Sequence, residues 1–149
     1  MLKVAFLGPL TSSFAERVHA YLSVPCDFIH TDEKNAVDML PGVDVLVTLI
    51  FTREMGASAK QLRLIQVPGA GLDRIDRAAM PPSVSLSKVH GHETGIAEYV
   101  MGAIVELGNV LMTPHVAGWT DGMLEARAKM IAENIGRTAR GQAPLNRVA

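Results

Sequence analysis

Residues 43–67 read VDVLVTLIFTREMGASAKQLRLIQV. The two apolar runs in this stretch, 43–50 and 62–67, have the length and apolarity of strands buried on both faces, as in a parallel sheet. Between them, 53–60 has the length of a short crossover helix. A strand, a helix and a second strand in this order are typical of a βαβ unit, so this segment predicts an α/β fold.

The same alternation extends in both directions along the chain. Ser13 and Glu16 can form a capping box that starts a helix after Thr11. Further strands are predicted at 3–7, 26–30 and 84–89, and short helices at 36–40 and 72–79. Five strands joined by crossover helices predict a doubly wound parallel sheet with three layers, α/β/α.

Two longer helices are predicted in the last third of the chain. The first, 94–107, is apolar almost all round, so both of its sides need cover. A strand at 109–113 follows. The second helix starts at a Thr120 cap and places Leu124, Ile131 and Ile135 on one face until Gly141 ends it, which predicts a long amphipathic C-terminal helix.

Composition excludes several functional classes. Lys and Arg number 14 against 15 Asp and Glu, a net charge of −1, so general binding to nucleic acid is not expected. An apolar content of 48% suits one compact domain over 1–149. Cys26 is the only cysteine, which excludes an internal disulfide and fits a reducing cytoplasm. We expect neither a signal peptide nor a membrane span, since no apolar stretch approaches about 18 residues.

The loop 69–74, GAGLDR, follows a predicted strand and is similar to a dinucleotide-binding fingerprint. Arg74 stands where the third glycine would allow close helix packing, and Pro81 and Pro82 stop the helix that would carry the pyrophosphate. Two interpretations remain. The backbone amides of Ala70 and Gly71 can bind a small carboxylate, or the glycines serve a tight turn only.

Three other patterns carry a functional and a purely structural interpretation. Residues 11–13, TSS, can hold the phosphate of FMN or merely cap a helix. His90 and His92, next to Glu93, can bind a metal through their two imidazoles. However, Gly91 favours a turn and no third protein ligand is evident in the sequence, so no metal is expected. His115 follows an apolar strand at the end of the sheet where such folds carry out chemistry, but a lone histidine is also commonly structural.

Four segments, in order, resemble the D-2-hydroxyacid dehydrogenases, a family that includes phosphoglycerate, formate and glyoxylate or hydroxypyruvate enzymes. They lie between residues 62 and 148: LRLIQVPGAGLDRID (62–76), HETGIAEYVMGAIVEL (92–107), NVLMTPHVAGWTDG (109–122) and AENIGRTARGQAPLNRV (132–148). The resemblance implies a flavodoxin-like substrate domain built from both chain ends. In the family a Rossmann domain is inserted between two linking helices, whereas here 1–107 runs through a junction at 108–109 directly into 110–149.

The resemblance also implies roles for individual residues. Ala70 and Gly71 correspond to the amides that hold the substrate carboxylate, Leu49 and Ile50 to the loop over the substrate side chain, and His115 to the general acid/base. The sequence HGHE at 90–93 departs from the asparagine that the family often has there. The parent enzyme would use NAD, but this chain is expected to hold no cofactor and to be inactive alone.

The expected partners are a weakly bound small 2-hydroxy or 2-oxo carboxylate and a second copy of the chain. A homodimer would cover the apolar helix 94–107, and exchange of the final strand and helix around Gly108 is one route to it. No nucleic acid or membrane partner is expected. Two alternatives stay open: a flavodoxin-like FMN- or phosphate-binding module, and an engineered minimal scaffold without activity.

Overall fold

The computed structural model describes residues 1–91, 93–105 and 121–148. Five strands form one sheet in the order β2-β1-β3-β4-β5, and every neighbouring pair is parallel. The strands are β1 (Leu2–Leu7), β2 (Cys26–Thr31), β3 (Val45–Val47), β4 (Leu64–Val67) and β5 (Ser85–Lys88). This order is that of the flavodoxin-like doubly wound fold, which confirms the predicted fold class.

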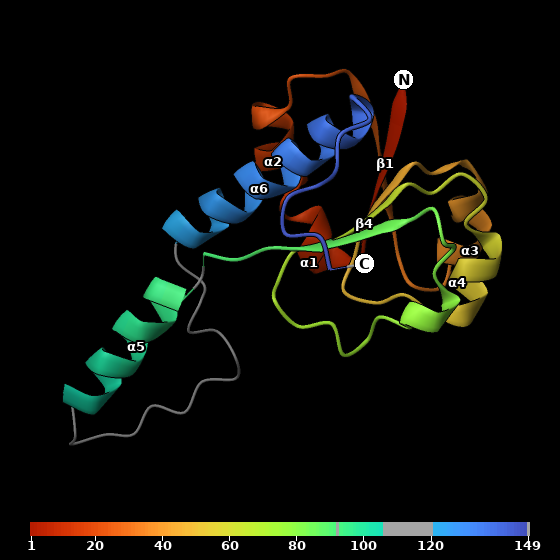
Figure 1. Ribbon diagram of the computed structural model, residues 1–149. Helices are drawn as coiled ribbons and strands as arrows, with labels where there is room; N and C mark the ends of the chain where they lie inside the picture. Colours follow the sequence, from red (N-terminus) through yellow and green to blue (C-terminus); the bar gives the residue numbers. More distant parts are fainter. Residues whose placement is uncertain (92, 106–120, 149) are drawn as a thin grey trace.

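Helices cover both faces of the sheet (Figure 1). The helical elements are α1 (Pro9–Ser12), α2 (Ala15–Tyr21), α3 (Ala36–Met39), η1 (Leu40–Gly42), α4 (Arg53–Ser58), η2 (Arg77–Ala79), α5 (Glu93–Val105) and α6 (Asp121–Ala139). Helices α2 and α6 pack on one face, whereas α3 and α4 lie on the other. The three-layer arrangement follows from this distribution.

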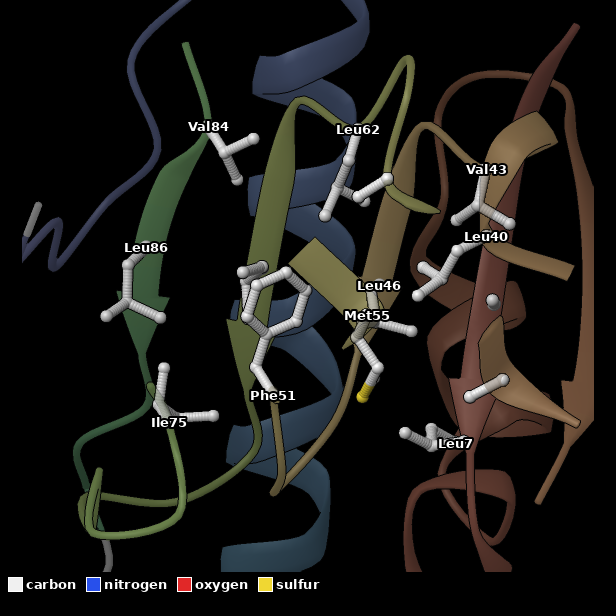
Figure 2. Packing of buried hydrophobic residues seen from close by; sticks show 14 of the residues in the cluster. Leu7, Leu40, Val43, Leu46, Phe51, Met55, Leu62, Ile75, Val84 and Leu86 are labelled. Atoms are coloured by element: carbon white, nitrogen blue, oxygen red, sulfur yellow. The ribbon is translucent and has the colours of Figure 1, made fainter. Parts of the chain in front are cut away.

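The core has two halves, one on each side of the sheet, because successive strand residues point to opposite faces. In β1, Ala5 and Leu7 face the helices α3 and α4, whereas Val4 and Phe6 face α2 and α6. Figure 2 shows the first half, in which Phe51 and Met55 pack against Leu46. All four β1 residues are buried, so this strand is covered on both faces, as the apolar run at 3–7 predicts.

The predicted capping box at Ser13 is wrong. Helix α1 already starts at Pro9, a residue whose fixed φ suits the first turn of a helix, and Ser13 closes this helix at its C-terminal end. The Ser13 hydroxyl donates to the Leu10 carbonyl at 2.7 Å, and α2 starts after Phe14 without a side-chain cap. Because α1 starts at Pro9, Ser13 lies at the end of this helix and its hydroxyl is not available to cap a second helix.

The predicted helix 72–79 is also mostly wrong, because only Arg77–Ala79 forms a short 3₁₀ turn. The Phe51 amide donates to the Arg74 carbonyl at 3.0 Å, and the Asp76 amide donates to the Phe51 carbonyl at 2.8 Å. These bonds form a parallel bridge between Phe51 and Ile75. Backbone groups that an α-helix would need are thus used in pairing with the segment after β3.

The two long helices differ in burial. In α6, Ile131 and Ile135 are fully buried against the sheet and Leu124 packs on the same core, as predicted. In α5, Ile96, Val100 and Met101 are exposed, and Figure 1 shows this helix standing apart from the sheet. The predicted strand 109–113 and the Thr120 cap lie outside the described residues. No helix in the described ranges has the length and apolarity needed to cross a membrane.

Candidate functional site

The candidate site lies where β3, β4 and β5 end. Parallel strands bring their carboxyl ends to the same side of the sheet, and the segments that leave them are neighbours. The Val89 amide, just after β5, donates to the Gly69 carbonyl at 3.2 Å, and Phe51, after β3, pairs with Ile75. The segments 48–51, 68–75 and 89–91 therefore form one continuous rim.

A buried threonine shapes the segment after β3. The Thr48 hydroxyl donates to the Ile50 carbonyl at 2.8 Å and accepts from the Ile50 amide at 3.0 Å. These two bonds turn the chain, so the strand stops at Val47 and does not reach Ile50 as the apolar run predicts. Leu49 and Ile50, both half-buried, consequently stand in a loop at the rim.

The loop after β4 presents free backbone donors. Gly69 and Ala70 are half-buried and Gly71 is exposed. Within the described part of the chain, the amides of Ala70 and Gly71 donate to no acceptor, whereas the Gly69 carbonyl is held by Val89. Adjacent unused N–H groups on an anchored loop can bind an anion.

Backbone conformation alone does not explain the two glycines. The glycines with positive φ in the described ranges are Gly8, Gly91 and Gly141, and neither Gly69 nor Gly71 is among them. A Cβ added at Gly69 would meet nothing within 4 Å, and one at Gly71 would meet only the Asp73 carboxylate, at 3.3 Å. The tight-turn interpretation requires a conformation restricted to glycine, which the loop does not have.

The loop geometry does not fit a dinucleotide. A pyrophosphate binds at the N-terminus of the helix that directly follows such a loop. Here the chain after Gly71 pairs with Phe51, and the short turn η2 starts only at Arg77. Arg74 points to the exposed Glu33 carboxylate, 3.3 Å away. The described residues therefore offer no place for the pyrophosphate of NAD at this loop.

The segment after β5 is held by its own carboxylate. The Gly91 amide donates to Glu93 Oε2 at 2.8 Å, and His90 Nδ1 lies 3.6 Å from Glu93 Oε1. Gly91 has a φ of 100°, which only glycine adopts readily, but the described residues 89–91 form no regular turn. No group of three His, Cys, Asp or Glu side chains able to hold a metal occurs in the ranges that the structure describes. His92 and His115 lie outside those ranges.

The hydroxyls at 11–13 act within their own turn. The buried Thr11 hydroxyl donates to the Gly8 carbonyl at 3.0 Å, and Ser13 donates to Leu10. Helix α1 has four residues, too short to concentrate a helix dipole. These contacts lend no support to a phosphate site at this turn.

A buried polar cluster that was not predicted from the sequence lies beneath the rim. Asn134 of α6 contacts Gln66 of β4 and Ser87 of β5, and all three side chains are fully buried. A signal was present in the sequence, since Gln66 interrupts the apolar run LIQV and Ser87 interrupts the run VSLSKV. Buried polar groups need partners, so each of these positions predicted an unknown partner elsewhere in the chain.

Strand order and the rim together define a flavodoxin-like α/β domain with a candidate anion site at the carboxyl ends of its strands. The family described as D-isomer specific 2-hydroxyacid dehydrogenase, catalytic domain, matches residues 4–149. The chain belongs to this family, as the resemblance of its four segments predicts. A comparison with curated proteins finds no match.

Solved structures show the same fold. A D-isomer specific 2-hydroxyacid dehydrogenase family protein from Aeromonas salmonicida is 19% identical with a TM-score of 0.60, and the match covers 71% of this chain and 35% of that protein. NAD⁺-bound 3-phosphoglycerate dehydrogenase from Entamoeba histolytica is 17% identical with a TM-score of 0.59, covering 91% and 51%. NAD-dependent formate dehydrogenase from Staphylococcus aureus is 20% identical with a TM-score of 0.54, covering 71% and 37%.

This chain therefore matches between 35% and 51% of the length of these three proteins.

Proposed function

We propose that this chain is the substrate-carboxylate-binding part of a 2-hydroxyacid dehydrogenase. The observation that carries the proposal is the pair of unused amides at Ala70 and Gly71, on a loop whose glycines are not required by backbone conformation. Leu49 and Ile50 stand on the neighbouring segment and would contact the side chain of the substrate. A small 2-hydroxy or 2-oxo carboxylate fits this combination of donors and apolar surface.

The proposed binding is weak. A hydrogen bond from an amide to a charged acceptor contributes about 1.5–3 kcal/mol, so two of them give roughly 3–6 kcal/mol. A dissociation constant of about 1 mM corresponds to about 4 kcal/mol. Within the described residues no Lys or Arg side chain is hydrogen-bonded to the loop 69–71, so we expect affinity in the millimolar range.

An NMR titration with oxalate tests this proposal. The amides of Ala70, Gly71 and Leu72 should shift together with a millimolar midpoint. Ala70→Pro removes one donor and should abolish the shifts of Gly71 and Leu72, whereas Ala70→Ser keeps the amide and should titrate like the parent. Shifts confined to another surface, with this loop silent, would exclude the site.

We further propose that the isolated chain does not transfer hydride, although His115 matches the family's acid/base. Hydride transfer needs a nicotinamide held about 3–3.5 Å from the substrate carbon, and this positioning supplies a large part of the catalysis. The loop 69–74, which is similar to a dinucleotide fingerprint, lacks the following helix that a pyrophosphate needs. We expect no NADH binding by calorimetry and no absorbance change at 340 nm with glyoxylate, hydroxypyruvate or phenylpyruvate. Turnover that disappears in His115→Ala would contradict this.

The order of the segments supports a proposal on domain organisation. The resemblance to the family implies a Rossmann domain between the segments that correspond to 92–107 and 109–122 here, and we propose that 108–109 marks the place of that domain. The length of the native open reading frame tests it. A frame that codes for this chain without interruption would show a naturally reduced relative, and a frame about twice as long would show a deletion.

A further inference from the structure

The buried cluster around Asn134 connects three parts of the molecule through one side-chain amide. Asn134 Nδ2 lies 2.7 Å from Gln66 Oε1, 2.9 Å from Ser87 Oγ and 3.2 Å from the Leu145 carbonyl oxygen. Asn134 Oδ1 accepts from the Leu145 amide at 2.6 Å. The backbone amide of Leu145 can only donate, so it fixes the orientation of the Asn134 amide and leaves the NH₂ group for the two strands.

Each of the two strand contacts lies close to the proposed carboxylate loop. Gln66 is three residues before Gly69 on β4, and its backbone carbonyl accepts from the Thr48 amide at 3.1 Å, just before the Leu49–Ile50 turn. Ser87 is two residues before Val89, whose amide donates to the Gly69 carbonyl. The three strand ends that form the rim are therefore linked to Asn134 by one or two hydrogen bonds each.

The C-terminal segment is held at the same point. The Ser87 hydroxyl donates to the Leu145 carbonyl, Ser87 and Arg147 form an antiparallel bridge, and the Val148 amide donates to the Leu86 carbonyl at 2.8 Å. This segment covers the outer side of β5 and brings its backbone to the Asn134 amide. The C-terminal segment, β4 and β5 therefore meet at this cluster.

We infer that Asn134 is a positioning residue that ties the ends of β4 and β5 to the C-terminal segment and thereby sets the direction of the Ala70 and Gly71 amides. This inference rests on the proposed carboxylate site. Backbone pairing already sets the register of β4 against β5. An apolar side chain would fill the same volume between α6 and the sheet, but it would not bond the Gln66 and Ser87 side chains to the C-terminal segment. A satisfied buried polar network fixes one arrangement, which donors aimed at a small anion require.

Thr138 provides a matched control. It is buried in the same helix one turn further on, and its hydroxyl donates to the Asn134 carbonyl at 2.8 Å, within the helix. Thr138→Val should lower stability through the loss of a buried hydrogen bond without touching β4 or β5. Any effect on the loop that merely reflects lower stability would appear in both variants.

The experiment compares Asn134→Leu, Gln66→Met and Thr138→Val in the full ¹⁵N-labelled chain. Without ligand, the order parameters of the Gly69, Ala70 and Gly71 amides should fall in the first two variants and stay unchanged in Thr138→Val. With oxalate, the dissociation constant should rise about fivefold in the first two and change less than about twofold in the control, as loss of roughly one hydrogen bond implies.

The two readouts separate the two proposals. If oxalate leaves the parent's loop amides unshifted, the carboxylate site is wrong, and the order parameters alone then decide whether Asn134 positions the loop. Should Asn134→Leu fail to fold, Gln66→Met decides, because it removes the β4 contact and keeps the others. Unchanged order parameters in the variant that decides, or an equal fall in Thr138→Val at matched stability, would overturn the inference.

Discussion

Helices α5 and α6 are both rich in apolar residues, but in the described part of the chain only α6 contributes fully buried residues to the core. Ala128, Ile131 and Ile135 of α6 are fully buried against the sheet. Ile96, Val100 and Met101 of α5 are 38%, 46% and 59% exposed. A helix with one apolar stripe is suited to a single partner surface, whereas a helix that is apolar all round needs cover from several sides.

The difference shows that hydrophobicity and stability contribution are separate properties. An apolar side chain stabilises the fold only by the surface that folding removes from water. By this criterion α6 contributes to the stability of the domain, whereas the apolar surface of α5 is available for association. Large exposed apolar surface is a mark of an interaction site.

The largest expected effect is on the free energy of unfolding when a buried side chain of α6 is shortened. Ile131→Ala creates a cavity between α6 and the sheet and should cost about 2–5 kcal/mol. Ile96→Ala removes the same atoms from the exposed helix and should change stability by no more than about 0.5 kcal/mol. Urea denaturation measures both. An equal loss in the two variants would mean that α5 is covered in solution.

Association through α5 is the next effect. We expect a homodimer that covers this helix, with exchange of the final strand and helix at Gly108 as one route. Val100→Glu places a charge on the apolar surface and should weaken association about tenfold or more, since an unpaired charge resists burial. Sedimentation velocity over a range of concentrations measures the dissociation constant. Glu98→Gln serves as a control, because it changes the charge of the same helix without placing a new charge on the apolar surface.

A dimer unaffected by Val100→Glu would move the interface away from α5. A parent chain that stays monomeric over the whole concentration range would contradict the prediction itself.

The same contrast explains how much the sequence predicts. Five apolar runs were enough to identify the strands and the fold class, because burial on both faces of a parallel sheet leaves a continuous apolar signal. Local details failed where one hydrogen bond competes with another. Pro9 starts α1 early and uses Ser13, and pairing of Ile75 with Phe51 replaces the helix predicted at 72–79.

The candidate site was only partly predictable for a different reason. The loop 69–71 has a local signal, its two glycines, but this signal fits both a tight turn and an anion site, and the φ angles argue only against the tight turn. The cluster of Gln66, Ser87 and Asn134 has no local signal beyond one polar residue in each apolar segment. Its members lie up to 68 positions apart in the chain, and only the fold brings them together.

A substitution at Arg127 of α6 should raise the stability of the domain, whereas Ile131→Ala lowers it. The Arg127 Nε atom is buried and has no hydrogen-bond partner in the part of the chain that the structure describes, and burial lowers the pKa of its guanidinium below the usual range. A buried polar group without a partner costs about 1–3 kcal/mol. Arg127→Met should therefore stabilise the domain by about 1 kcal/mol in urea denaturation. Lys129→Met, on the exposed face, should have little effect.

The smallest expected effect is on the reactivity of the Cys26 thiol, which lies at the edge of the core half that α6 covers. Cys26 starts the edge strand β2 and packs, partly buried, against the core half on that side. Burial raises the pKa of its thiol above the ordinary value, and the nearby N-terminal ammonium group opposes this rise. Because the folded pKa lies above the unfolded one, the associated stability is complete below the unfolded value, near 8.5, and is lost as the pH rises through the folded value.

Iodoacetamide should accordingly alkylate the folded chain more slowly at about pH 8 than the urea-unfolded chain, since the thiolate is the nucleophile. The decline in stability above about pH 8 should be smaller in Cys26→Ser, which has no thiol to titrate. Equal alkylation rates in the folded and unfolded chain would place Cys26 outside the surface that α6 and its neighbours protect.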